Sequence, residues 1–355
     1  MQGRPEMRAV RGSATLKAQP AAPSRIYGPE PDRMTLDDIK RGFAADLSRV
    51  DRVIRERLAS DVVLINQVAE YIVASGGKRV RPLVVVIAAR ACGYRGERHA
   101  DAATIIELIH TATLLHDDVV DGSTLRRGQD TANSVWGNEA SVLVGDFLYS
   151  RAFQMMVSLG EMRIMSVMAD ATNRIAEGEV LQLMNTGDPE TTEERYFDVI
   201  HRKTARLFEA GTQIAAILAG ATPAVEAAMA RYGRHLGVAF QLVDDVLDYS
   251  AGPEQRGKNV GDDLAEGKPT LPLIHALRNG SEADRQLIRH AIEQGGVADI
   301  ERITAIIEST GGLDYTARLA RQEANLAIDA LADLPASAQR EALRGLADFA
   351  VNRTY

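Results

Sequence analysis

The chain of 355 residues contains a single cysteine, Cys92, and few aromatic residues, which make up 5% of the sequence. One thiol cannot form an intrachain disulfide or a cysteine-rich metal site, and this scarcity is typical of proteins from a reducing compartment. Sheets and barrels depend on aromatic and β-branched side chains, so the low aromatic content favours helices. We therefore expect an all-helical protein located in the cytoplasm.

The sequence also lacks a positive net charge and a long apolar run. The net charge of −8 argues against nucleic acid as a partner, because bulk attraction to phosphates needs a basic protein. The longest uncharged stretch, around residues 211–225, contains polar residues and is shorter than the ~18 apolar residues of a spanning helix. We expect no transmembrane segment, and an anionic ligand would need local basic clusters or metal ions.

The composition divides the chain near residue 33. Residues 1–33 are rich in Arg, Pro, Ala, Gly and Ser and have no hydrophobic period, so we expect a disordered N-terminal extension. Its excess of Arg and Lys is also typical of a transit peptide, but we favour a variable tail. From residue 34 to residue 355, apolar residues recur at helical spacing, with breaks at glycine and proline. This predicts a single all-α domain of roughly ten or more helices, without β-hairpins.

Two aspartate clusters of identical spacing lie in apolar helical segments. The first ends the segment HTATLLHDDVVD, and the second ends QLVDDVLD. Asp117 and Asp121 are four residues apart and share a helix face, as do Asp244 and Asp248, with Gln241 one turn earlier. The candidate metal ligands are Asp117, Asp118, Asp121, Asp244, Asp245 and Asp248.

Such clusters predict a cation. Like charges on a half-buried helix face repel one another and are costly to desolvate. Ligation by carboxylate oxygens suits Mg²⁺, which also takes ligands from substrate phosphates. A single cluster could equally be a solvated helix face, but two of them on separate apolar helices favour a metal site. The sequence does not have the alternating oxygen ligands of an EF-hand.

Basic, glycine-containing segments accompany both clusters. The segment GGKRVRP at residues 76–82 opens an apolar helix, where Lys78 and Arg81 are candidate ligands for a diphosphate. Arg126 and Arg127 follow the first cluster, and guanidinium groups bind phosphate oxygens in pairs. Lys258 and Lys268 follow the second cluster in a glycine-rich stretch. This arrangement is expected where metal ions and protein cations share one diphosphate.

Together these motifs resemble a known family. GGKRVRP, HTATLLHDDVVD, LRRG, GDFLYSRAF, EGE, KTA, FQLVDDVLD and GKNVGDDLAEGKPTLP occur in the order found in trans-prenyl diphosphate synthases. The resemblance runs from Thr35 to the C-terminus and is closest to the long-chain octaprenyl, solanesyl and decaprenyl group. It implies an isoprenoid-synthase-type helical bundle around a deep central cavity, a homodimer, and roughly three Mg²⁺ ions when substrate is bound.

The resemblance also implies roles for individual residues. Both aspartate motifs would hold Mg²⁺ on an allylic diphosphate. The implied cations of the allylic site are Arg126, Lys203, Lys258 and Lys268. The implied pocket for isopentenyl diphosphate consists of Lys78, Arg81, His110 and Arg127. Lys203, Thr204 and Gln241 would lie near the carbocation and, with Asp117 and Asp244, would be the catalytic residues. Whether Arg353 acts as the basic C-terminal tail of some relatives stays open.

Those roles define the expected chemistry. Metal ions and cations would stabilise the departing diphosphate, and an apolar pocket would keep water from the allylic cation. The double bond of isopentenyl diphosphate would attack this cation, and the released diphosphate would remove a proton. Without the resemblance, His110, Lys203 and Gln241 would be interpreted as structural residues.

Small residues upstream of the first cluster suggest a long product. Ala112 and Thr113 lie about one turn before Asp117 on the expected helix, where short-chain relatives carry bulky aromatics. Gly233 and Gly237 continue the stripe of the second cluster without bulk, whereas Ile109 and Met168 are candidates for the cavity floor. Ala112 could also serve close helix packing. We predict a product of about eight to ten isoprene units, for a quinone side chain, and peripheral contact with a membrane for its release.

Four alternatives remain distinguishable. A shorter-chain, geranylgeranyl synthase would stop early. A class I terpene cyclase would carry a DDxxD motif but would ignore isopentenyl diphosphate. A subunit of a heteromeric synthase would turn over only with its partner, although such subunits typically lose their aspartate motifs. A helical scaffold would tolerate Asp117→Ala.

Overall fold

The computed structural model describes residues 34–353 except residues 75–76, 127 and 251–260. Residues from Met34 onward belong to one compact unit. The predicted N-terminal extension lies outside the described residues, as do the candidate substrate ligands Arg127 and Lys258.

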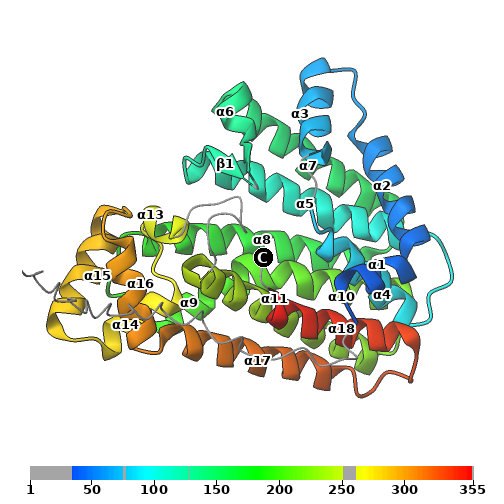
Figure 1. Ribbon diagram of the computed structural model, residues 1–355. Coiled ribbons are helices and arrows are strands. Elements are labelled where there is room, and N and C mark those ends of the chain that lie inside the picture. Colours follow the sequence, from blue (N-terminus) through cyan, green and yellow to red (C-terminus); the bar gives the residue numbers. More distant parts are fainter. Residues whose placement is uncertain (1–33, 75–76, 127, 251–260, 354–355) are drawn as a thin grey trace, which may run out of the picture. The chain divides into compact units, whose positions relative to one another are not determined.

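The described part of the chain is almost entirely helical (Figure 1), which confirms the predicted all-α fold. Its first half contains α1 (Leu36–Gly42), α2 (Ala44–Leu58), α3 (Val63–Ala74), α4 (Val80–Ala91), α5 (His99–Val120), α6 (Ala132–Trp136), α7 (Asn138–Leu159), α8 (Met162–Asn185) and α9 (Glu193–Ile200). Its second half contains the π-helix η1 (His201–Ala205), α10 (Arg206–Leu218), α11 (Pro223–Ser250), α13 (Asp262–Ala265), α14 (Leu271–Asn279), α15 (Glu282–Gln294), α16 (Ile300–Ser309), α17 (Gly312–Ala330) and α18 (Ala338–Asn352).

One short hairpin departs from the helical pattern. Strands β1 (Leu125–Arg126) and β2 (Gln129–Asp130) pair antiparallel, with Arg126 opposite Gln129. The prediction that the chain has no β-hairpin was wrong here. Strands of two residues are too short to produce an alternating pattern, and Gly128, with φ +75°, allows the tight turn between them.

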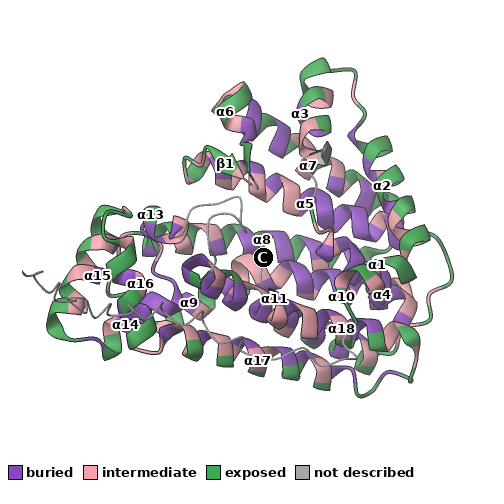
Figure 2. Ribbon diagram, in the orientation of Figure 1, coloured by how far each residue is buried: buried purple, intermediate pink, exposed green. Residues whose placement is uncertain are grey.

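The core lies where α4, α5, α10 and α11 pack together, and Figure 2 shows their long buried stretches. Close packing at the crossing of α10 and α11 depends on glycine. A Cβ atom at Gly233 would lie 2.4 Å from the carbonyl oxygen of Phe208, and one at Gly237 would lie 2.6 Å from Cα of Ala205. These glycines therefore allow α11 to touch α10 and the end of η1. The interpretation that they leave open space below the second aspartate cluster was wrong.

Candidate active site

The first aspartate cluster lies at the C-terminal end of α5. Asp117 and Asp118 belong to its last turn, and Asp121 is the C-cap residue. The C-terminus is the negative end of the helix dipole, so three carboxylates there require compensation by cations. Each one has such a partner: Lys203 Nζ is 3.4 Å from Asp117, Arg126 Nη2 is 2.7 Å from Asp118, and Lys268 Nζ is 2.7 Å from Asp121.

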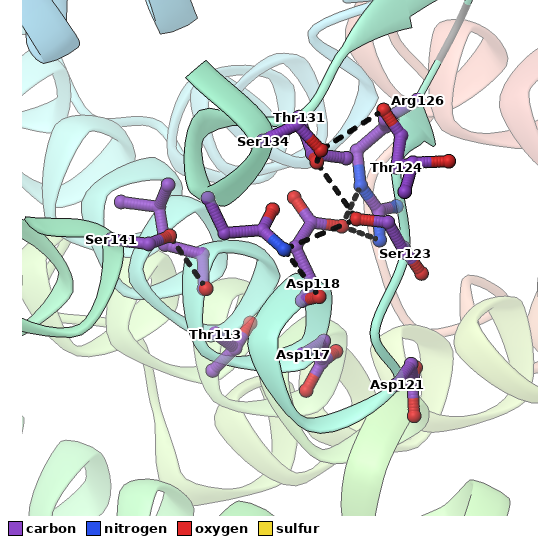
Figure 3. A network of polar contacts seen from close by, with 12 residues as sticks. Thr113, Asp117, Asp118, Asp121, Ser123, Thr124, Arg126, Thr131, Ser134 and Ser141 are labelled. Carbon is purple, nitrogen blue, oxygen red and sulfur yellow. Dashed lines mark hydrogen bonds and ion pairs between the residues drawn. The ribbon is translucent and has the colours of Figure 1, made fainter. Parts of the chain in front are cut away.

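Asp118 differs from its two neighbours. Its side chain is buried, and Nε of Arg126 donates to it over 2.8 Å, while its backbone carbonyl accepts from Asn133. Figure 3 shows Asp118 turned toward this network beside the hairpin, with Asp117 and Asp121 outside it. Asp118 therefore anchors the hairpin, whereas Asp117 and Asp121 face the two lysines.

The second cluster lies in the last two turns of α11 and also contains exposed and buried carboxylates, but here both Asp245 and Asp248 are buried. Asp244 is 46% exposed, and Nη1 of Arg353 lies 2.7 Å from its carboxylate. Asp245 is buried and accepts hydrogen bonds from the Tyr196 hydroxyl at 2.5 Å and from Gln241 Nε2 at 2.9 Å. Burial, and then the nearby carboxylate of Asp263, raises the pKa of Asp245 well above its usual range. The carboxyl group of Asp245 is therefore held inside the protein by hydrogen bonds, whereas the carboxylate of Asp244 is open to solvent.

The π-helix η1 links the two clusters. Its Lys203 lies against Asp117 of α5, and the hydroxyl of the next residue, Thr204, donates to Gln241 Oε1 of α11 over 3.0 Å. Gln241 in turn donates to Asp245. Single π-helical turns occur most often at functional sites. Three of the predicted catalytic residues therefore lie between the two aspartate clusters.

The segment from Asp262 to Lys268 makes a second link. The backbone N–H of Asp263 donates to Asp248 over 3.3 Å, and Lys268 contacts Asp121. Burial disfavours the charged ammonium of Lys268, but Asp121, Glu266 and Asp263 outweigh this effect and raise its pKa. The ends of α5 and α11 are therefore connected twice, and the two clusters belong to one site.

Oxygen ligands suitable for Mg²⁺ are present at this site. Three carboxylates form ion pairs with protein cations that a metal ion can displace: those of Asp117, Asp121 and Asp244. Among the described residues, no three carboxylate, histidine or cysteine side chains converge on one point. Mg²⁺ usually binds through one or two carboxylates together with waters and substrate phosphates. The donor set fits an ion whose coordination is completed by a diphosphate.

The basic segment before α4 lies beside α5. Nη1 of Arg81 is 3.0 Å from Nε2 of His110, and the guanidinium lies over the ring of Phe208, 4.6 Å from its centre. These contacts bring together two of the predicted ligands for isopentenyl diphosphate. The third, Lys78, lies two residues before the start of α4 and is half-buried. Stacking on Phe208 fixes the plane of the Arg81 guanidinium group.

Arg79, in the same segment, was not predicted to have a role. It caps α4 with a left-handed backbone, φ +50°, and its side chain forms an ion pair with Glu107 of α5. The signal for this pair was Glu107 itself, because a carboxylate within an apolar helix needs a buried partner. A pocket lined by both residues and by His110, Asp118 and Arg126 connects the basic segment with the first cluster.

The candidate chain-length residues lie deeper in the bundle. Ile109, Ala112 and Met168 are each 0% exposed and belong to one hydrophobic cluster. Thr113 is half-buried, and its hydroxyl donates to the carbonyl oxygen of His110 over 2.8 Å. Of these four residues, Thr113 alone keeps accessible surface.

Three further residues of the site were given no role by the sequence analysis. Glu179 of α8 binds Lys203 at 2.5 Å, and Glu266 binds Lys268 at 2.5 Å. Burial raises the pKa of Glu179 to about 7, although Lys203 opposes the shift. Arg353 donates through all three nitrogens, to Asp244, to the carbonyl of Phe240 and to that of Ala350. Glu179 and Glu266 lie in motifs that carry the family resemblance, and the sequence analysis left the role of Arg353 open.

Comparisons with known proteins agree with this geometry. A family model described as polyprenyl synthetase matches residues 62–309. The octaprenyl diphosphate synthase of Escherichia coli (strain K12) is 60% identical over 256 residues, which are 72% of this chain and 79% of that protein.

Two solved structures are similar throughout. A polyprenyl synthase from Caulobacter crescentus CB15, complexed with calcium and isoprenyl diphosphate, has a TM-score of 0.88 and 45% identity, covering 92% of this chain and 100% of that one. A decaprenyl diphosphate synthase from Rhodobacter capsulatus has a TM-score of 0.85 and 43% identity, covering 90% and 100%. The predicted trans-prenyltransferase class is confirmed, and the chain belongs to the polyprenyl synthetase family.

Proposed function

We propose that this enzyme adds isopentenyl diphosphate repeatedly to an allylic diphosphate such as farnesyl diphosphate, and that it makes an all-trans product of about eight to ten isoprene units. One observation carries the proposal. The two aspartate clusters are connected through Lys203 and Thr204 on one side and through Lys268 on the other. The site therefore combines metal ligands with cations, as the departure of a diphosphate requires.

The residues have distinct roles in this reaction. Mg²⁺ would be held by Asp117, Asp121 and Asp244, as roughly three ions, and would stabilise the negative charge that develops on the leaving diphosphate. Lys203 and Lys268 bind the same diphosphate once it replaces their contacts with the aspartates.

The second substrate binds at the other side of the first cluster. Lys78, Arg81 and His110 orient the diphosphate of isopentenyl diphosphate, and Arg126, which is paired with Asp118, belongs to the cations of the allylic site. The Thr204 hydroxyl and the Gln241 side chain, which are hydrogen-bonded to each other, would stabilise the developing allylic cation with their oxygen dipoles. Arg127 and Lys258, which lie outside the described residues, complete the two sets of cations.

The surface supports the homodimer that we also propose. Large apolar side chains are exposed on two neighbouring helices: Val142, Leu143 and Val157 on α7, and Val180, Leu183 and Met184 on α8. Monomeric proteins rarely expose large apolar patches, so a second copy that covers these helices would remove the surface from water. Sedimentation equilibrium tests this point, since the mass is that of two chains if the proposal holds.

We further propose that the enzyme acts in the cytoplasm and touches a membrane peripherally when it releases a long product for a quinone side chain. None of the helices in the described ranges has the length and hydrophobicity that crossing a bilayer requires.

Burial raises the pKa of the Cys92 thiol to about 11, so this thiol stays protonated at neutral pH.

A product assay tests the proposed function. Purified protein is incubated with labelled isopentenyl diphosphate, farnesyl diphosphate and Mg²⁺, and the extracted chains are sized by chromatography. We expect chains of about eight to ten units, and none when EDTA removes the metal. Products of geranylgeranyl length would overturn the proposed chain length. Failure to incorporate isopentenyl diphosphate would indicate a cyclase or a missing partner subunit.

A further inference from the structure

The Glu177-Gly178-Glu179 motif of α8 packs against η1, and each of its three residues contacts Arg202 or Lys203. Glu177 forms an ion pair with Arg202, with 2.6 Å between Oε2 and Nη1. A Cβ atom at Gly178 would lie 2.7 Å from the backbone nitrogen of Lys203, so only glycine permits this approach. Glu179 then contacts Nζ of Lys203 at 2.5 Å. The motif brings α8 close enough for Glu179 to bind the lysine between the aspartate clusters.

Lys203 contacts two carboxylates. Its ammonium lies 2.5 Å from Glu179 and 3.4 Å from Asp117, and all three side chains are largely removed from solvent. Lys268 repeats this arrangement, with Asp121 on one side and Glu266 on the other. In both cases one partner belongs to the first aspartate cluster and the other does not.

The two partners respond differently to a metal ion. A cation that binds Asp117 cancels the attraction between this aspartate and Lys203, and it repels the ammonium directly. Lysine has a long, flexible side chain that would then gain freedom by moving into solvent. The ionised carboxylate of Glu179, which is not one of the predicted metal ligands, stays in contact with Lys203 and opposes that movement.

We propose that Glu179 is a positioning residue, which keeps Lys203 at the first aspartate cluster after metal binds and so prepares it to bind the allylic diphosphate. This inference rests on the proposed function and assigns a role that the aspartate motifs do not supply. The charge of Glu179 is required, rather than its shape. Glu266 has the corresponding position beside Lys268.

Glu179→Gln tests the role of the charge, because it preserves the shape of the side chain. We expect the KM for farnesyl diphosphate to rise about tenfold, with the KM for isopentenyl diphosphate nearly unchanged. Glu179→Asp restores the charge and should recover part of the loss. Glu177→Gln is the matched control, since it removes an ion pair between the same two elements at a residue that does not contact Lys203. Its kinetic constants should equal those of the unmodified enzyme.

Calorimetry with inorganic pyrophosphate and Mg²⁺ provides a readout that does not depend on turnover. Glu179→Gln should weaken pyrophosphate binding by about tenfold, whereas Glu177→Gln should not. If the unmodified enzyme binds pyrophosphate but makes no polyprenyl product, the proposed function is wrong. The comparison of pyrophosphate affinity between Glu179→Gln and Glu177→Gln still tests the role of Glu179.

Two outcomes would overturn the inference. One is equal pyrophosphate affinity in Glu179→Gln and the control. The other is a loss in Glu179→Gln that affects both substrates equally and accompanies a lower thermal midpoint, which would indicate a purely structural role.

Discussion

At the residue scale, the two aspartate clusters contain carboxylates of two kinds. Asp118 and Asp245, the second aspartate of each motif, are buried and bound by neighbouring side chains. Asp117, Asp121 and Asp244 are more exposed, and each forms an ion pair with a lysine or arginine of another element. A buried carboxylate that loses its partners is costly, so we assign the first kind to holding the site together and the second to ligation of metal.

Thr113 provides a test of chain length at a single residue. It lies on α5 about 6 Å before Asp117 along the helix axis and keeps accessible surface, so a larger side chain has room to project below the site. We expect Thr113→Phe to shorten the main product to the geranylgeranyl length, because the first condensation with farnesyl diphosphate continues and later ones are blocked. Chromatography of the labelled products measures the change.

Thr113→Ser serves as the control for this variant, because it keeps the hydroxyl that donates to His110 and adds no bulk. Its products should match those of the unmodified enzyme. Full-length products from a folded Thr113→Phe enzyme would contradict the assignment of Thr113 to the path of the growing chain.

The spacing of the aspartates predicted the site but did not distinguish these two kinds of residue. Identical DDxxD motifs predict identical faces, whereas the partners that divide them come from distant parts of the chain. Tyr196 is 49 residues before Asp245, and Arg353 is 109 residues after Asp244. Such partners depend on how helices pack, which helical periodicity does not specify.

At the element scale, the contact between α8 and η1 depends on Gly178. Replacing a mid-helix glycine by alanine usually stabilises a helix by about 0.5–1 kcal/mol. At Gly178 the added Cβ would collide with the backbone of Lys203, so we expect Gly178→Ala to lower the free energy of unfolding by about 1–3 kcal/mol. Urea denaturation measures the difference.

Gly42→Ala is the matched control, since a Cβ atom at Gly42 of α1 meets nothing within 4 Å. This variant should be neutral or slightly more stable. If Gly178→Ala were equally stable, the close approach of η1 to α8 would be refuted.

The contact between α2, α4 and the start of α5 predicts a pH dependence. His99 is buried next to Asp46, 2.8 Å away, and to Arg90. Burial, and then the charge of Arg90, lowers the pKa of His99 below 6.5, although Asp46 opposes this shift. The unfolded chain therefore binds a proton near pH 6.5 that the folded chain does not, and the free energy of unfolding should fall as the pH drops below 6.5.

His99→Gln should remove this part of the pH dependence, at some cost in stability at neutral pH. Urea midpoints measured from about pH 5 to about pH 8 give the two profiles. Parallel profiles for the variant and the unmodified protein would exclude His99 as the source.

Periodicity predicted the helical elements better than the contacts among them. The glycine and proline signals at Gly93, Gly122 and Pro223 lie at helix boundaries in the structure. The same kind of residue was misjudged at Gly233 and Gly237, because a glycine inside a helix can mark either an open cavity or a close crossing. Only the neighbouring helix decides between these two meanings.

At the scale of the whole molecule, the fold places the ends of two long core helices, α5 and α11, at one site. The repulsion among their carboxylates is offset by cations carried on η1, on the segment after α13 and at the end of α18. This arrangement makes the site dependent on cations and ready to exchange protein cations for metal and diphosphate.

A double-mutant cycle tests most directly whether both clusters bind one Mg²⁺–diphosphate group. Calorimetry would measure the affinity for inorganic pyrophosphate with Mg²⁺ in the unmodified enzyme, in Asp117→Asn, in Asp244→Asn and in the double variant. We predict that each single change weakens binding and that the double variant loses less than the sum, by more than about 0.5 kcal/mol. Losses that add within about 0.5 kcal/mol, or an unchanged affinity in either single variant, would contradict a shared site.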